Sequence, residues 1–169
     1  MRFLILFIFL ITNVSANDLP QIKNIVIHKD TKTYDNVIFF DKKDQKINLK
    51  DFNGNLVVLN FWATWCEPCE EEMPSLDRLQ INPNLNNLKI FPINISKENI
   101  EKVNIFFKDL GIKNFEPYFD SPATLAKTFS LRGVPTSILF DKNGKEFARI
   151  IGSIDFDDEK FINWLKMYN

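Results

Sequence analysis

The two cysteines of this chain, Cys66 and Cys69, are the residues best suited to chemistry. They are its only cysteines, and two residues separate them. Such a pair alternates between a dithiol and a disulfide, because one thiolate attacks a disulfide of another molecule and the second thiol resolves the mixed disulfide. The spacing therefore predicts thiol–disulfide exchange, with Cys66 as the nucleophile and Cys69 as the resolving thiol.

The segments on either side of the pair indicate how it is positioned. Residues 56–62 form a nearly continuous apolar run, which is typical of a strand buried on both faces. After Cys69, the apolar residues of 73–79 recur at helical spacing. Cys66 should therefore lie at a helix start, where free backbone N–H groups and the helix dipole stabilise a thiolate. A Cys-x-x-Cys in this setting favours a thioredoxin-like redox site.

Three other uses of the cysteine pair fit the sequence less well. A structural zinc site usually has four ligands, whereas the chain offers two cysteines and one distant histidine, His28. A purely structural disulfide across so short a loop would constrain the unfolded chain very little. A chance pair does not explain the strand and helix around it. We therefore expect no metal here and interpret His28 as a solvated residue.

Glu72 is the third candidate catalytic residue. It follows Cys69 by three positions, which places it on the same face of the predicted helix. Burial would raise the pKa of its carboxyl group toward neutrality and allow it to accept the proton of the resolving thiol. The alternative is an ordinary solvated charge within the acidic run 70–72.

Several segments of the chain resemble the TlpA/ResA-type thioredoxin-like proteins, which are bacterial extracytoplasmic thiol–disulfide reductases. The resemblance lies in residues 61–69 and 72–74 around the cysteines, in 49–54 before them, and in 133–137 and 141–145 after them. It covers roughly residues 36–169, and within the family the chain looks most similar to the TlpA branch.

The resemblance implies an α/β thioredoxin-like fold with a central mixed β-sheet flanked by helices. It adds an N-terminal β-hairpin and a helical insertion before a cis-proline loop. It also implies that Pro135 is that cis-proline and that Glu72 is the base. Cytoplasmic thioredoxins carry a buried aspartate where this chain has Asn60, and an amide cannot exchange a proton, so base duty should fall on Glu72.

Five residues are expected to bind the substrate. The backbone of Val134, beside Pro135, would pair with an extended client segment. Trp65 would be a partly exposed docking surface, whereas Trp62 is expected in the core or at the rim. Glu67 and Pro68 separate the cysteines and would tune the redox potential, with the negative charge of Glu67 opposing thiolate formation at its neighbour.

The remaining sequence predicts further elements. They are a hairpin over 37–40 and 46–49, a helical turn over 49–52, a strand over 88–95, a helix from Ser96 to Leu110 with Ser96 as its cap, a short helix over 122–129 capped by Ser121 with Pro122 at its first position, a hairpin over 136–140 and 145–151, and a last helix capped by Asp155.

The N-terminus predicts export. A positive start precedes the apolar run 3–11, and small residues follow before Asn17, which is the layout of a secretory signal peptide over 1–16. The run is far shorter than the ~20 residues of a membrane-spanning helix, although an uncleaved anchor is the alternative. Residues 17–35 are expected to form an extended tail, followed by one thioredoxin-like domain over 36–169.

These features predict a reductase in the periplasm of a Gram-negative bacterium, with an inner-membrane tether as an alternative. The resemblance implies client proteins in copper-site assembly of cytochrome oxidase or in cytochrome c maturation, and a membrane thiol carrier as the electron donor. A disulfide oxidase or isomerase, or a copper-chaperone relative, remains the alternative. The net charge of −1 gives no reason to expect nucleic acid. We expect a monomer whose only cofactor is its own disulfide.

Overall fold

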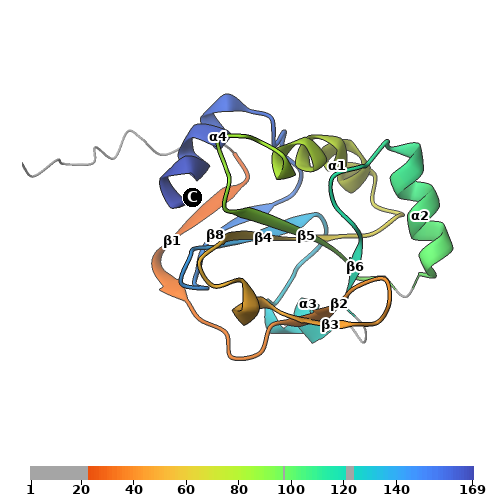
Figure 1. Ribbon diagram of the computed structural model, residues 1–169, viewed down its shortest axis with the longest axis horizontal. Helices are drawn as coiled ribbons and strands as arrows, with labels where there is room; N and C mark the ends of the chain where they lie inside the picture. Colours follow the sequence, from red (N-terminus) through yellow and green to blue (C-terminus); the bar gives the residue numbers. More distant parts are fainter. Residues whose placement is uncertain (1–22, 97, 121–123) are drawn as a thin grey trace, which may run out of the picture.

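The computed structural model describes residues 23–96, 98–120 and 124–169. Within them, eight strands form one mixed sheet in the order β1-β8-β7-β4-β5-β6-β2-β3 (Figure 1). The strands are β1 (Ile25–Lys32), β2 (Ile38–Phe40), β3 (Lys46–Asn48), β4 (Leu56–Trp62), β5 (Leu88–Asn94), β6 (Tyr118–Phe119), β7 (Thr136–Phe140) and β8 (Glu146–Ile151). Strands β4, β5 and β6 run parallel, whereas β7 lies antiparallel to β4 and β8.

The helices cover both faces of this sheet. They are α1 (Glu67–Gln80), α2 (Ile100–Asp109), α3 (Thr124–Thr128) and α4 (Glu159–Leu165), with 3-10 turns η2 (Leu49–Phe52) and η3 (Lys166–Tyr168). In Figure 1, α1 and α4 lie above the sheet, and α3 lies below it near the β2–β3 hairpin, which forms one edge of the sheet. This arrangement confirms the predicted thioredoxin-like fold, including the added hairpin and a helix before the Pro135 loop.

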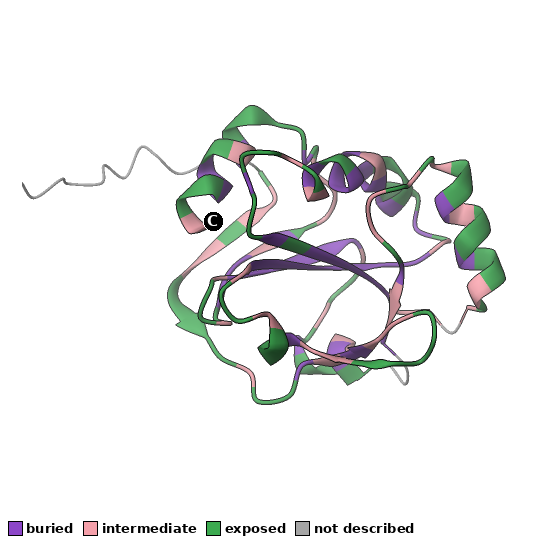
Figure 2. Cartoon of the chain, viewed as in Figure 1, coloured by how far each residue is buried: buried purple, intermediate pink, exposed green. Residues whose placement is uncertain are grey.

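Strand β4 lies at the centre of the molecule and is buried along its whole length (Figure 2). Its side chains alternate between two apolar cores. Val58 and Trp62 pack on the side of α1, whereas Val57 and Phe61 pack on the side of α3. Because both faces are covered, the strand needs the continuous apolar run seen in the sequence.

The N-terminal segment differs from its prediction. Residues 25–32 lie within the expected tail 17–35, yet they form β1, an edge strand that pairs antiparallel with β8. Ile25 and Ile27 pack against the core on the side of α1. The short apolar patch alone does not reveal a strand, because the pairing partner lies more than a hundred residues away.

His28 lies on β1, and its interpretation as a solvated residue is wrong. Its Nε2 is 2.5 Å from Glu146 Oε1, and its side chain is largely buried. Glu146 lies on β8, the partner strand, so the contact forms only when the edge strand is in place. The side chain therefore belongs to a polar cluster of the interior.

Two helix caps also differ from prediction. Asn99 rather than Ser96 caps α2, because Asn99 Oδ1 accepts the Lys102 N–H at 2.9 Å. Asp158 rather than Asp155 caps α4. In each case the predicted residue lies three positions too early. Several polar residues precede both helices, and sequence pattern alone does not show which of them reaches the free N–H groups.

Some predictions fall outside this description. The signal peptide over 1–16 and the cap formed by Ser121 and Pro122 lie outside the described residues. Among the residues that are described, no helix is long and apolar enough to span a bilayer.

Candidate active site

The cysteine pair lies where the central strand gives way to α1. Cys66 and Cys69 form a disulfide with a Cα–Cα distance of 5.3 Å. Cys66 is the N-cap of α1, and its Sγ accepts the backbone N–H of Cys69 at 3.3 Å. A sulfur that caps a helix receives both this hydrogen bond and the positive end of the helix dipole. Cys66 therefore lies at the helix start, as predicted, and its role as the nucleophile stays a prediction.

The two cysteines differ little in exposure. In the disulfide state Cys66 is 5% exposed and Cys69 is 0% exposed, and both belong to the core on the side of α1. Glu67 and Pro68, which separate them, are exposed. Of the two cysteines, Cys66 therefore keeps the small exposed area, and Cys69 is shielded.

The two tryptophans before the disulfide divide as predicted. Trp62 is fully buried and stacks on Phe106 of α2. Trp65 is 67% exposed, and its Nε1 donates to Ser96 Oγ at 3.0 Å. This hydrogen bond anchors the indole of Trp65, the residue next to Cys66, to Ser96. An exposed, anchored aromatic ring is suited to contact a client protein.

The Pro135 loop lies at the same end of the sheet as the disulfide. The Val134–Pro135 peptide bond is cis, as the resemblance implied. Strand β7 starts at Thr136, which pairs with Phe61 near the end of β4. The loop before β7 and the segment after β4 therefore meet at one edge. Val134 is half-buried and Pro135 is buried.

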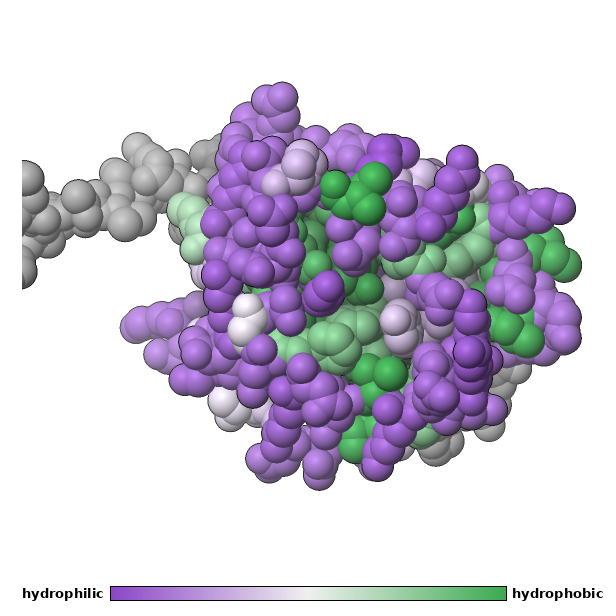
Figure 3. All heavy atoms as spheres, viewed as in Figure 1, coloured by the Kyte–Doolittle hydropathy of each residue, from purple (hydrophilic) through white to green (hydrophobic). Residues whose placement is uncertain are grey.

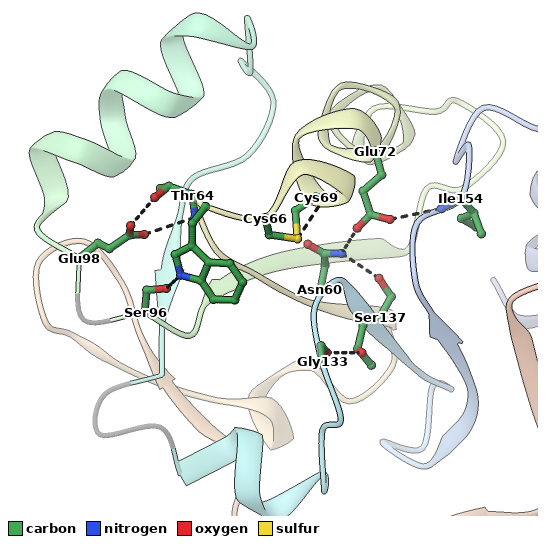
Figure 4. The surroundings of a disulfide bond; sticks show 12 residues. Asn60, Thr64, Cys66, Cys69, Glu72, Ser96, Glu98, Gly133, Ser137 and Ile154 are labelled. Carbon is green, nitrogen blue, oxygen red and sulfur yellow. Dashed lines mark hydrogen bonds between the residues drawn. A yellow bond between two sulfur atoms is a disulfide. The ribbon is translucent and has the colours of Figure 1, made fainter.

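Glu72 is buried, which excludes its interpretation as a solvated charge. It is 2% exposed, whereas Glu71 beside it is exposed. Its Oε1 accepts a hydrogen bond from Asn60 Nδ2 at 2.7 Å, and its Oε2 accepts the Ile154 N–H at 3.4 Å (Figure 4). Burial raises the pKa of Glu72 to about 8, and the two hydrogen bonds oppose this rise only in part.

A pocket of about 460 Å³ lies beside Glu72 on the side of α1. Its polar walls are formed by Glu71, Ser75, Arg78, Ser153 and Asp155.

A family model described as the AhpC/TSA family matches residues 28–145. The chain belongs to the AhpC/TSA family. The thiol-disulfide oxidoreductase ResA of Bacillus thuringiensis subsp. konkukian is 38% identical over 117 residues, and the match covers 69% of this chain and 66% of that protein, just under two thirds. ResA of Geobacillus thermodenitrificans is 33% identical over 125 residues, which cover 73% of this chain and 70% of that protein.

A solved structure supports the fold of this AhpC/TSA family member. The pneumococcal exposed lipoprotein thioredoxin Etrx1 of Streptococcus pneumoniae strain TIGR4 superposes with a TM-score of 0.66 at 23% identity. The superposition covers 79% of this chain and 99% of Etrx1, and at this identity it shows the fold alone. Both relatives above are named ResA, so placement in the TlpA branch stays a prediction.

Sequence reasoning missed two groups of hydrogen bonds at the site of this AhpC/TSA family member, one around Glu98 and one around Asn60. Thr64 donates through its side chain to Glu98, which precedes α2 and accepts a further bond from Asn94. Asn60, considered only as a residue unable to exchange protons, donates to Glu72 and also to Ser137 Oγ at 2.9 Å. The alternation along 56–62 could have revealed this residue, since it places a polar side chain in an otherwise apolar row.

Proposed function

We propose that the protein is an extracytoplasmic thiol–disulfide oxidoreductase that reduces disulfide bonds of client proteins. The observation that carries the proposal is the disulfide at the N-terminus of α1, with Cys66 as the capping residue and Glu72 buried one turn beyond Cys69. The names of the ResA relatives support this activity.

Reduction of a client starts with the Cys66 thiolate. It attacks one sulfur of the client disulfide, the client S–S bond breaks, and the other client sulfur leaves as a thiolate that takes up a proton. The product is a mixed disulfide between Cys66 and the client. The helix start favours the attacking thiolate, because the free N–H groups and the helix dipole stabilise negative charge there.

Resolution uses Cys69 and Glu72. The carboxylate of Glu72 takes the proton of the Cys69 thiol, and the Cys69 thiolate attacks Cys66 Sγ. The mixed disulfide breaks, the second client sulfur leaves and is protonated, and the client has gained two electrons while the protein has become a disulfide. With a pKa of about 8, Glu72 populates both charge states near neutral pH, as a general base requires.

Client docking would use the exposed groups around Cys66. Trp65 offers an apolar face, Glu67 and Pro68 flank the nucleophile, and the Val134 backbone beside Pro135 would pair with an extended client segment. Suitable clients are disulfide-bearing copper chaperones, oxidase subunits and apocytochromes c. A membrane thiol carrier would return the protein to the dithiol state.

A reductant role, rather than that of an oxidase, follows from the charge next to the nucleophile. A strong oxidant is one whose reduced thiolate is stabilised, and the negative charge of Glu67 beside Cys66 works against that. A reduction potential near that of thioredoxin, about −270 mV, is therefore expected, whereas a value near −120 mV would identify an oxidase.

Export belongs to the same proposal. Residues 1–16 would direct the chain out of the cytoplasm, into the periplasm if the host is Gram-negative. Fractionation of cells that express the whole chain, compared with a chain that starts after residue 16, tests this. Equal cytoplasmic retention of the two forms would contradict export.

The activity is tested with the reduced full chain and a test disulfide such as insulin. Cys66→Ser should reduce insulin no faster than buffer, because it lacks the nucleophile. Cys69→Ser should accumulate mixed disulfides, which non-reducing electrophoresis detects and which would also capture clients. Normal turnover by Cys69→Ser would show that the roles are assigned wrongly.

A further inference from the structure

Asn60 is a polar residue in an apolar environment. It is fully buried on β4, and its neighbours on the same face, Val58 and Trp62, belong to the core that contains both cysteines. Side chains alternate along a strand, so Asn60 also faces α1. The first turn of that helix carries Cys69, and the second carries Glu72, to which Asn60 is hydrogen-bonded.

The amide of Asn60 is only half satisfied. Its Nδ2 donates to Glu72 Oε1 at 2.7 Å and to Ser137 Oγ at 2.9 Å, which uses both hydrogens. Its Oδ1 is buried and has no donor among the residues that the structure describes. Figure 4 shows this oxygen turned toward the disulfide, away from Glu72 and Ser137. A buried carbonyl oxygen without a donor destabilises the fold and needs an explanation.

The redox state of the neighbouring cysteines supplies one. The sulfurs of a disulfide carry no hydrogen, so neither can donate to Asn60. Reduction by a dithiol breaks the Cys66–Cys69 bond, transfers two electrons to the sulfurs and turns the donor into a disulfide. Of the two protons that the donor gives up, one goes to Cys69 and the other to Cys66 or, where Cys66 is a thiolate, to the solvent. A shielded thiol such as that of Cys69 stays protonated, and its S–H is then a donor inside the protein.

We propose that Asn60 is a positioning residue whose Oδ1 accepts the S–H of Cys69 in the reduced protein. The two sides of one amide then hold the resolving thiol and its base, Glu72, in fixed positions. This inference rests on the proposed function only in that the disulfide cycles between two states. Because Oδ1 gains a donor only on reduction, Asn60 favours the dithiol.

The first test measures the redox equilibrium of the folded chain with dithiothreitol, which requires no client. Asn60→Leu removes Oδ1 and keeps the branching at Cγ, and it should lower the equilibrium constant for reduction about tenfold, or ~30 mV for two electrons. Ser137→Ala is the matched control, because it removes the other neutral partner of the amide and leaves Oδ1 in place. Equal constants for the wild type, Asn60→Leu and Ser137→Ala would overturn the proposal.

Asn60→Leu also removes the hydrogen bond from Nδ2 to Glu72. Repeating the comparison in a Glu72→Gln background separates the effect of this loss from the effect of losing Oδ1. Asn60→Leu should still lower the constant there by about the same factor. A shift that disappears without the carboxyl group would show that Asn60 acts through Glu72 alone. If the wild-type protein failed to reduce insulin but Asn60→Leu still lowered the equilibrium constant as expected, the result would count against the proposed function and not against this inference.

A second measurement leaves Asn60 unchanged and does not depend on how its variants fold. In Cys66→Ser, Cys69 is the only thiol, and its S–H stretching band can be recorded by infrared spectroscopy. A band at lower frequency than that of a free thiol is expected. A band at the free-thiol frequency would indicate the opposite amide orientation, with Nδ2 toward the sulfur, and would refute the proposal.

Discussion

Two buried glutamates of this protein, Glu72 on α1 and Glu146 on β8, have pKa values that are shifted in opposite directions. They are 2% and 0% exposed, so loss of water penalises the charge of both. The pKa of Glu72 is nevertheless raised to about 8, whereas the pKa of Glu146 is lowered below its ordinary value. The difference lies in the donors that surround each carboxyl group.

Glu72 receives its hydrogen bonds from neutral groups, the Asn60 amide and the Ile154 N–H. Glu146 is also penalised by burial, but Arg149 donates to both of its oxygens, and Tyr34 and His28 contact it as well. Together these donors, with Arg149 first among them, outweigh the desolvation of the carboxylate and lower its pKa. Burial therefore prepares a carboxyl group for proton exchange only where no cation is paired with it.

The groups around Glu146 come from distant parts of the chain. Arg149 Nη1 donates to the carbonyl of Phe129 after α3, and Tyr34 and His28 approach from the N-terminal segment. The cluster joins β1, β8 and the α3 region. The face of the molecule drawn in Figure 3 is mostly hydrophilic. Glu146 thus has a structural role, whereas Glu72 lies beside the redox pair.

The largest effect on this difference between the two glutamates should come from removing the cation, Arg149. Arg149→Met keeps much of the side-chain volume but leaves the Glu146 carboxylate buried with only Tyr34 and His28. We expect a loss of about 3–5 kcal/mol in the free energy of unfolding, measured with urea, because an unpaired buried charge is strongly destabilising.

The double variant Glu146→Gln, Arg149→Met is the control. It removes the charge together with its partner and should recover most of the loss. If Arg149→Met alone is as stable as the wild type, Arg149 is not what holds Glu146 ionised, and the explanation of the contrast is wrong.

The second prediction concerns rate. Glu72→Gln keeps the hydrogen-bonding shape but removes the base, so resolution of a preformed mixed disulfide should slow about 10²-fold near neutral pH. The rise of the wild-type rate near pH 8 should also disappear, which stopped-flow measurements across pH can follow. Glu146→Gln is the matched control, and its pH–rate profile should keep the wild-type shape. Identical profiles for the wild type and Glu72→Gln would eliminate Glu72 as the base.

The sequence predicted where the cysteine pair and Glu72 lie, because the signals that place them are local. The apolar run before Cys66 and the helical spacing after Cys69 are contained in 56–79, and Glu72 lies on a helix face fixed by those spacings. The polar cluster around Glu146 was missed, since His28 is 118 positions from it in the chain. No pattern in a single sequence links residues that meet only when β1 is added to the sheet edge.

The third prediction follows from proton linkage. Unfolded, Glu72 loses its proton near its ordinary pKa of 4.5, whereas the folded protein keeps it up to about pH 8. Between these values the folded state binds the extra proton. Its stabilising effect is complete below pH 4.5 and is lost as the pH rises through 8, by up to about 1.4 kcal/mol per pH unit.

Urea denaturation at several pH values measures this slope. Subtracting the curve of Glu72→Gln isolates the contribution of Glu72, because the amide does not titrate. Glu146 acts in the opposite direction, since its stabilisation is present above its unfolded pKa and is lost as the pH falls below it. A flat difference between wild type and Glu72→Gln from pH 5 to pH 8 would show that Glu72 is ionised in the folded protein.

The smallest expected effect comes from removing one neutral donor from Glu146. Tyr34 donates to Glu146 Oε2 at 2.6 Å, and burial beside that carboxylate raises the pKa of Tyr34 to about 12, so the phenol stays a donor at neutral pH. Tyr34→Phe should cost about 1 kcal/mol in unfolding free energy, because Arg149 still pairs with the carboxylate. Tyr118→Phe, at a residue packed on the same core, is the control.

In Tyr34→Phe, the loss of unfolding free energy at acid pH should begin at a higher pH than in the wild type. The pH slope due to Glu72 should stay unchanged, because the two carboxyl groups depend on separate sets of donors. A change in that slope would show that the two sites are coupled, and the contrast between them would then not be one of local donors.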